Sequence, residues 1–88
     1  METTYFYVTC KRDSQTAYLV GPCRDHETAL ALVDTAREAA ERIDPFAAFY
    51  AFGTASITWN HKLLLVPDGK LNAIVGFDDA TNRIESVI

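Results

Sequence analysis

The side chains best suited to a binding function are aromatic, and several recur at alternate positions. Tyr5 and Tyr7 lie in a run of β-branched and aromatic residues, so an extended strand places both on one face. Tyr18 falls in the next apolar run and joins them if the two runs form a hairpin. We call Tyr5, Tyr7 and Tyr18 the tyrosine face. One further aromatic pair would complete it, either Tyr50 with Phe52 or Phe46 with Phe49.

The tyrosine face allows three interpretations. Aromatic rings on an open sheet can stack unpaired bases, but that use favours a basic surround. This chain is acidic, with eight Lys and Arg against twelve Asp and Glu and a net charge of −4. Tyr is also favoured in protein interfaces, because it combines contact area with a polar tip. Alternatively, the C-terminal strands or a second subunit cover this face. We expect burial or a protein contact, and single-stranded nucleic acid is the alternative ligand.

A second candidate surface is acidic. A stripe of carboxylates on a predicted helix, extended by Asp44, lies opposite the apolar side of that helix. Such a stripe can occupy a site built for nucleic-acid phosphate, although most acidic stripes are solvated surfaces. The predicted binding residues are therefore Tyr5, Tyr7, Tyr18, Tyr50, Phe52, Asp34, Glu38 and Glu41.

Residues that could catalyse a reaction or hold a metal do not form a known pattern. The sequence contains no GxSxG, HExxH or phosphate-loop motif. Asp25, His26 and Glu27 are adjacent, and adjacent helical residues do not share a face, so they cannot close a metal site unaided. We predict a protein that is not an enzyme, with no catalytic residues, no cofactor and no bound metal.

Length and composition predict one small domain over residues 1–88. A chain of 88 residues buries roughly 60–65% of the surface that its unfolded form exposes. Hydrophobic residues make up 49% and charged residues 23%, which is typical of a globular chain. No apolar run approaches the ~20 residues of a membrane span, and the first residues do not resemble a signal peptide. We expect a cytoplasmic protein with no membrane partner.

Two strands should carry the tyrosine face. Residues 4–11 and 16–20 are rich in strand-forming types, and the polar residues 12–15 between them predict a hairpin. Gly21 and Pro22 are expected to end the second strand, because Pro cannot donate to a ladder.

The register of this hairpin should keep the two cysteines apart. With a loop at 12–15, Cys10 lies opposite Ala17, and Cys23 lies near Thr4. Six residues of strand, about 20 Å, then separate the two thiols. A disulfide requires Cα atoms within about 7 Å, so we expect both thiols to be free.

One helix and a third strand should follow. Asp25 is the expected N-cap of a helix over about 26–43, and Asp44-Pro45 ends it. Residues 46–52 predict a strand. The apolar stripe of the helix, expected to pack on Phe6, Val8 and Leu19, comprises Ala29, Leu32, Val33, Ala36, Ala40 and Ile43.

The last third of the chain is predicted to be β-rich. Residues 63–66 and 71–77 flank a Pro-Asp-Gly turn and predict a hairpin, and 83–87 predict a short final strand after a turn. Residues 56–59 could extend the third strand past a bulge at Gly53. The expected fold class is α+β: an antiparallel sheet (β-β-α-β) with one helix packed on one face, plus a C-terminal β-hairpin.

Several blocks of the chain resemble short phage-borne and plasmid-borne proteins. The blocks are a YFYVT start at residues 5–9, an LVGP sequence at 19–22, an acidic helix start at 27–31 and an AFGT sequence at 51–54. The resemblance covers about residues 4–55. No activity is assigned to those proteins, so the resemblance carries over no catalytic residue.

The resemblance implies a mobile-element context, in which small acidic proteins often act by binding a host protein. Inhibitors of bacterial immunity, including anti-CRISPR proteins, are the best-known class of this kind. We therefore expect a small non-enzymatic binding protein that blocks or modulates a host protein or protein–nucleic-acid complex. A two-fold homodimer through the tyrosine face or a strand edge is a further expectation.

Overall fold

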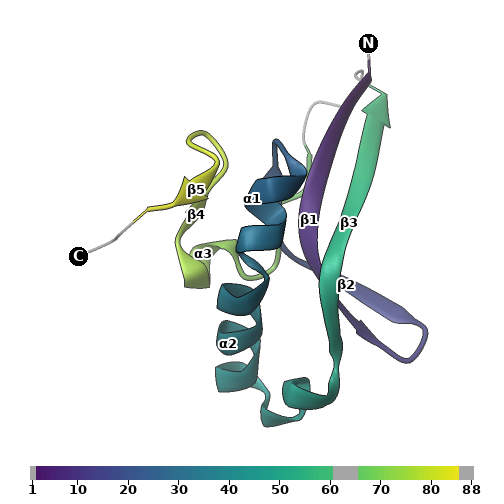
Figure 1. The fold of residues 1–88 in the computed structure, drawn as a ribbon, viewed down its shortest axis with the longest axis vertical. Coiled ribbons are helices and arrows are strands. Elements are labelled where there is room, and N and C mark those ends of the chain that lie inside the picture. The colour runs from purple at the N-terminus through teal and green to yellow at the C-terminus, as the bar shows by residue number, and fades with distance from the viewer. Residues whose placement is uncertain (1, 61–65, 86–88) are drawn as a thin grey trace.

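Three antiparallel strands form the main sheet, in the order β2-β1-β3 (Figure 1). The computed structural model describes residues 2–60 and 66–85. β1 (Glu2–Arg12) and β2 (Gln15–Cys23) are joined by a two-residue turn, and β3 (Ala51–Asn60) pairs with the other side of β1. Helices pack against this sheet and a two-stranded hairpin follows, so the predicted α+β class is confirmed.

The second strand runs further than predicted. β2 does not end at Gly21 and Pro22 but continues to Cys23. The peptide bond between Gly21 and Pro22 is cis. The register with β1 shifts twice, between Val8 and Thr9 and again between Phe6 and Val8, where β1 pairs with this Pro-containing end of β2.

The cysteines lie on the same sheet without pairing. Cys10 is opposite Ala17, as predicted, but the two register shifts together place Cys23 opposite Phe6 rather than Thr4. Four residues of β1, about 13 Å, separate the two positions. Both thiols are free and buried, and burial raises the pKa of Cys23 to about 11.

We expect the native thiols to resist a disulfide reagent at about pH 8, because the reactive thiolate is scarce when burial raises the pKa. In denaturant, two thiols per chain should titrate. Since the pKa of Cys23 is higher in the folded state, its stabilisation is present below about pH 9 and is lost as pH rises through about 11. Fewer than two thiols in denatured, unreduced protein would contradict the register.

The predicted helix is split in two. α1 (His26–Ala31) and α2 (Val33–Ile43) meet at Leu32, whose backbone leaves the helical region. The predicted N-cap is confirmed, since the Thr28 amide donates to Asp25 Oδ1 at 2.8 Å. No helix among the described residues has the length and apolar character needed to cross a bilayer.

Five of the six residues of the predicted apolar stripe lie in or against the core, despite the break. Ala29 and Ala36 are buried as predicted, and Leu32 is half-buried against the core. Ala39 is also buried, whereas Ile43 is 59% exposed and does not pack on the sheet. Ala36 and Ala39 lie beyond Leu32 and are buried, so the break does not change the phase of the stripe. Ile43 is the last residue of α2, next to η1, and the stripe ends before it.

The third strand begins later and ends later than predicted. Residues 46–49 belong to a 3₁₀ helix, η1 (Pro45–Phe49), rather than to a strand. β3 then continues through 56–59, as the sequence allowed, and keeps one register with β1 throughout, with no bulge at Gly53.

The C-terminal third differs most from the prediction. Residues 63–65 lie outside the described residues, and 71–77 contain a helical turn, α3 (Asn72–Val75), instead of a long strand. The hairpin lies further on, between β4 (Phe77–Asp78) and β5 (Arg83–Ile84), and the predicted turn before residue 83 is confirmed.

Side-chain and backbone hydrogen bonds attach this third of the chain to β2. The Gly21 amide donates to Asn72 Oδ1 at 2.9 Å, and Asn72 Nδ2 donates back to the Gly21 carbonyl. The amides of Gly69, Lys70 and Leu71 donate to carbonyls of β2. These contacts between distant segments explain why local sequence patterns misassigned residues 71–77.

Candidate protein-binding surface

The turn between α2 and β3 holds two aromatic rings in solvent. Asp44 caps η1, because its Oδ1 accepts from the Phe46 amide at 3.0 Å, and Pro45 follows at the first helical position. Asp44 Oδ2 also accepts from the Tyr50 hydroxyl at 3.0 Å, and this hydrogen bond raises the pKa of Tyr50. Phe46 and Phe49, three residues apart, lie on one side of the 3₁₀ helix.

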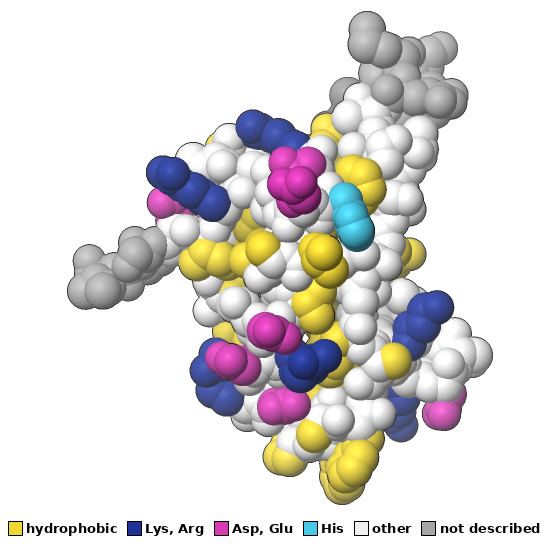
Figure 2. Space-filling view, in the orientation of Figure 1, with side chains coloured by type: hydrophobic (Ala, Val, Ile, Leu, Met, Phe, Trp, Pro, Cys, Tyr) yellow, Lys and Arg dark blue, Asp and Glu magenta, His cyan; other side chains and the backbone are white. Residues whose placement is uncertain are grey.

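We call Ile43, Phe46 and Phe49 the aromatic tip. Phe46 is 70% exposed and Phe49 is 85% exposed. Figure 2 shows hydrophobic side chains gathered at the lower end of the molecule, where Figure 1 places the junction of α2 and β3. Because large aromatic side chains are rarely left together in water, a cluster of this kind is a candidate interaction surface.

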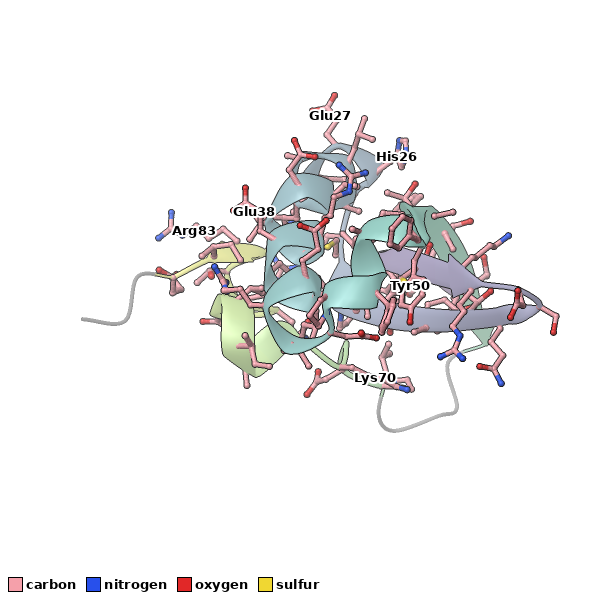
Figure 3. All side chains as sticks on the ribbon, turned by 90° about the horizontal axis from the view of Figure 1, so that it is seen from below. His26, Glu27, Glu38, Tyr50, Lys70 and Arg83 are labelled. Carbon is pink, nitrogen blue, oxygen red and sulfur yellow. The ribbon has the colours of Figure 1, made fainter. Side chains whose placement is uncertain are left out.

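One shallow hollow adjoins the aromatic tip, and a second lies next to it along the molecule. The first, of about 400 Å³, lies between the tip and Arg12, and the second, of about 510 Å³, continues from Arg12 to Lys70. Tyr50 lines both, and the Arg12 guanidinium carbon lies 5.9 Å from the centroid of its ring. Figure 3 views the molecule from this end, with Tyr50 and Lys70 labelled. Within the described part of the chain Arg12 forms no salt bridge, so one cationic side chain borders the tip beside the Asp44 carboxylate.

The tyrosine face is covered at its centre. Tyr7 is only 1% exposed, and its hydroxyl donates to the Pro67 carbonyl at 2.7 Å. Its ring contacts that of Tyr18 edge-to-face, with centroids 5.4 Å apart. Burial raises the pKa of Tyr7 to about 12. Tyr5 is half-buried and Tyr18 is 38% exposed, so only these two could present a ring to a ligand.

Neither Tyr50 nor Phe52 joins the tyrosine face. Phe52 is opposite Cys10 in the β1–β3 ladder, and opposed residues share a face. That face is the one covered by helices, since Arg37 of α2 lies 5.3 Å from the Phe52 ring centroid. Tyr50 packs against the same core and borders the aromatic tip instead.

The acidic residues remain on the surface of α2. Asp34 and Glu38 are exposed, and Glu41 is half-buried. Asp34 Oδ1 accepts from Arg37 Nη1 at 3.2 Å, which makes a local ion pair. The Asp44 carboxylate, by contrast, caps η1 and accepts a hydrogen bond from the Tyr50 hydroxyl. Figure 2 shows acidic and basic side chains interleaved over α2, as on a solvated helix face.

A further hollow, of about 670 Å³, lies beside Tyr5 and Pro67. Among its described wall residues the cation is Arg24, which donates through Nη2 to the carbonyls of Asp79 and Ala80 at 3.2 and 2.6 Å. These bonds give Arg24 a structural role in attaching the C-terminal hairpin.

The described residues bring no three His, Cys, Asp or Glu side chains together as a metal site. His26 Nε2 lies 3.0 Å from Thr54 Oγ1, and its ring contacts Phe6. In Figure 3, His26 and Glu27 point to different sides of α1, so these neighbours do not converge on one ligand.

The aromatic tip was not predicted, although the sequence contains a signal for it. Asp44-Pro45 was interpreted only as the end of a helix. The same pair is also typical of the start of one, with Asp as N-cap and Pro at the first position. A new helical turn would have placed Phe46 and Phe49 together outside the sheet.

Comparison with models of protein families, with curated proteins and with solved structures found no match for this chain.

Proposed function

We propose that this is a cytoplasmic, non-enzymatic binding protein that acts through a protein contact centred on the aromatic tip. The observation that carries the proposal is the exposure of Phe46 and Phe49 on a capped turn. Removing an aromatic side chain of this size from water contributes about 1.5–3 kcal/mol. Both rings are exposed in the chain alone, so a partner that buries them in a matching apolar pocket would be stabilised by this free energy.

The surroundings of the tip match the anatomy of a protein interface. Such interfaces have an apolar centre with aromatic anchors and a polar border. Here Phe46 and Phe49 form the centre, with Arg12 and Tyr50 on the border. Asp44 holds the turn through two hydrogen bonds, so less conformational entropy is lost on binding.

The proposed partner is a host protein complex that this protein blocks or modulates. The resemblance of residues 4–55 to phage-borne and plasmid-borne proteins supports this partner class, which includes bacterial immune complexes of the kind that anti-CRISPR proteins inhibit. A net charge of −4 also favours a protein over a nucleic-acid backbone, since attraction to phosphate requires a positive surplus.

The test uses the tagged chain as bait in a bacterial lysate, with captured proteins identified by mass spectrometry. Phe46→Ser with Phe49→Ser should weaken capture of a specific partner by about 100-fold, since each lost ring is worth at least tenfold. The matched control, Leu30→Ser with Ile74→Ser, changes two exposed apolar residues elsewhere and should capture the partner normally.

Salt dependence distinguishes the alternative ligand. Binding through the aromatic tip should change little as salt rises, whereas binding to single-stranded nucleic acid should weaken steeply. Equal capture by the wild-type chain and the tip variant, or capture of nucleic acid in place of protein, would contradict the proposed function.

A further inference from the structure

The two edge strands of the main sheet, β2 and β3, differ in whether another segment of the described chain covers them. The edge of β2 is covered, because the amides of Gly69, Lys70 and Leu71 donate to its carbonyls at 3.0, 2.9 and 2.7 Å. Among residues 2–60 and 66–85, β3 has β1 as its only strand neighbour. Figure 1 shows the second half of β3 at the margin of the molecule, with no other labelled element beyond it.

The open strand lacks the features that normally protect an edge. Natural sheets discourage edge pairing with charged residues, Pro, bulges or very short edge strands. β3 has ten residues, AFGTASITWN, with no charge and no Pro, and its register with β1 is unbroken. A long, neutral and regular edge of this kind is a template for another strand.

The accessible part of this edge is its second half. At the start of β3, Arg37 lies over Phe52, and α2 occupies that side. On the helix side, α1 reaches as far as Thr54, where His26 Nε2 lies 3.0 Å from Thr54 Oγ1. Beyond it, Ser56 and Thr58 are exposed.

We propose that β3 pairs antiparallel with β3 of a second copy of this chain, across a two-fold axis perpendicular to the sheet. The two three-stranded sheets then join into one sheet of six strands. The inference does not depend on the aromatic tip, and it commits to a second copy because the edge is complementary to itself.

Self-complementarity follows from the alternation of side chains. Thr54, Ser56 and Thr58 lie on the helix side of β3, where Thr58 Oγ1 is 2.8 Å from Thr4 Oγ1. Ala55 and Ile57 lie on the other side, opposite Tyr7 and Tyr5. In any antiparallel two-fold pairing, paired residues share a face, so even-numbered positions meet even-numbered ones.

Every pair formed within residues 54–58 therefore joins a hydroxyl with a hydroxyl or an apolar side chain with an apolar side chain. Pairs of both kinds stabilise neighbouring strands. No charged side chain of β3 opposes another, because the strand has none. An isologous interface needs one patch that matches itself, and residues 54–58 meet this requirement.

Pairing through this edge would give each dimer two aromatic tips. With the axis near Ser56, each tip lies about five residues of strand from the axis, so the tips are roughly 30 Å apart or more. The perpendicular axis keeps both on the helix side of the joined sheet. A partner complex with repeated subunits could then be bound at two points, which raises the overall affinity.

The decisive experiment is light scattering on the full chain over a wide concentration range. The wild-type chain should reach twice its mass of 9.8 kDa. Ser56→Lys should weaken dimerisation by about 100-fold, because the axis brings two added charges together in a strand pairing that like charges oppose. The matched control, Ser14→Lys in the exposed β1–β2 turn, should dimerise normally. A monomeric wild type, or an equally dimeric Ser56→Lys, overturns the proposal.

Two further measurements separate this proposal from the proposed function. The tip variant Phe46→Ser with Phe49→Ser should remain dimeric, and a monomeric tip variant would place the interface at the tip and overturn the edge pairing. In the wild type, amides of residues 54–58 should exchange hydrogen more slowly as concentration rises. Exchange that is independent of concentration overturns the pairing, even if Ser56→Lys fails to fold.

Discussion

Tyr7→Ala is expected to lower the free energy of unfolding by about 3–5 kcal/mol, the range for truncating a large buried aromatic residue. Tyr7 is among the largest fully buried side chains, and its hydroxyl donates to the Pro67 carbonyl at 2.7 Å. Removing it leaves a cavity and frees the segment that covers this face. Since a chain of this size has roughly 4–13 kcal/mol of stability in total, the loss is large. Urea denaturation followed by circular dichroism measures it.

Tyr18→Ala is the matched control, because it removes the same side chain from the same face. Tyr18 is 38% exposed, so we expect a loss of about 1 kcal/mol or less. Tyr7→Phe isolates the hydroxyl and should cost about 0.5–1.5 kcal/mol. Equal costs for the two Tyr→Ala changes would mean that the segment around Pro67 does not cover Tyr7.

Gly69→Ala is expected to destabilise the protein by about 3 kcal/mol or more. A Cβ at this position would lie 2.5 Å from the Leu19 carbonyl oxygen and 2.7 Å from Asn72 Oδ1. The Leu19 carbonyl belongs to β2 and cannot move aside as a flexible side chain would. Residues 69–71 would have to leave the edge of β2, with the loss of their three hydrogen bonds. Thermal and urea denaturation provide the measurement.

Gly53→Ala makes the same chemical change in β3 and serves as the control. No atom lies within 4 Å of a Cβ built at Gly53, so the change should alter stability by no more than about 0.5 kcal/mol. If both variants lose the same amount, close contact with β2 is not the reason for glycine at position 69.

Local features of the fold were predictable because their causes lie within a few residues. The polar turn set the register of Cys10 with Ala17, and the capping oxygen of Asp25 started the first helix. Predictions failed where contacts with a distant segment determine the local conformation. Asn72 forms a helical turn and bonds to Gly21, 51 residues away, although its own neighbours predicted a strand.

The candidate surface also depends on contacts between distant segments, which local sequence patterns do not predict. Alternation placed Tyr5 and Tyr7 together on one face, but alternation cannot tell which face another segment will cover. The backbone around Pro67 covers Tyr7, and η1 turns Phe46 and Phe49 away from the sheet. The aromatic side chains expected to gather on one surface are therefore distributed over two faces and an end.

The sequence by itself determined the α+β class, the first hairpin near its turn, the start of the helix at Asp25 and the place of the final turn. These depend on propensity, capping and turn chemistry, which act between near neighbours. Only the tertiary structure decided that Tyr7 is buried, that Phe46 and Phe49 are exposed, and that one edge of the sheet is covered while the other has no strand neighbour among the described residues. Burial is a property of contacts between segments far apart in the chain, and the order of residues along the chain does not specify those contacts locally.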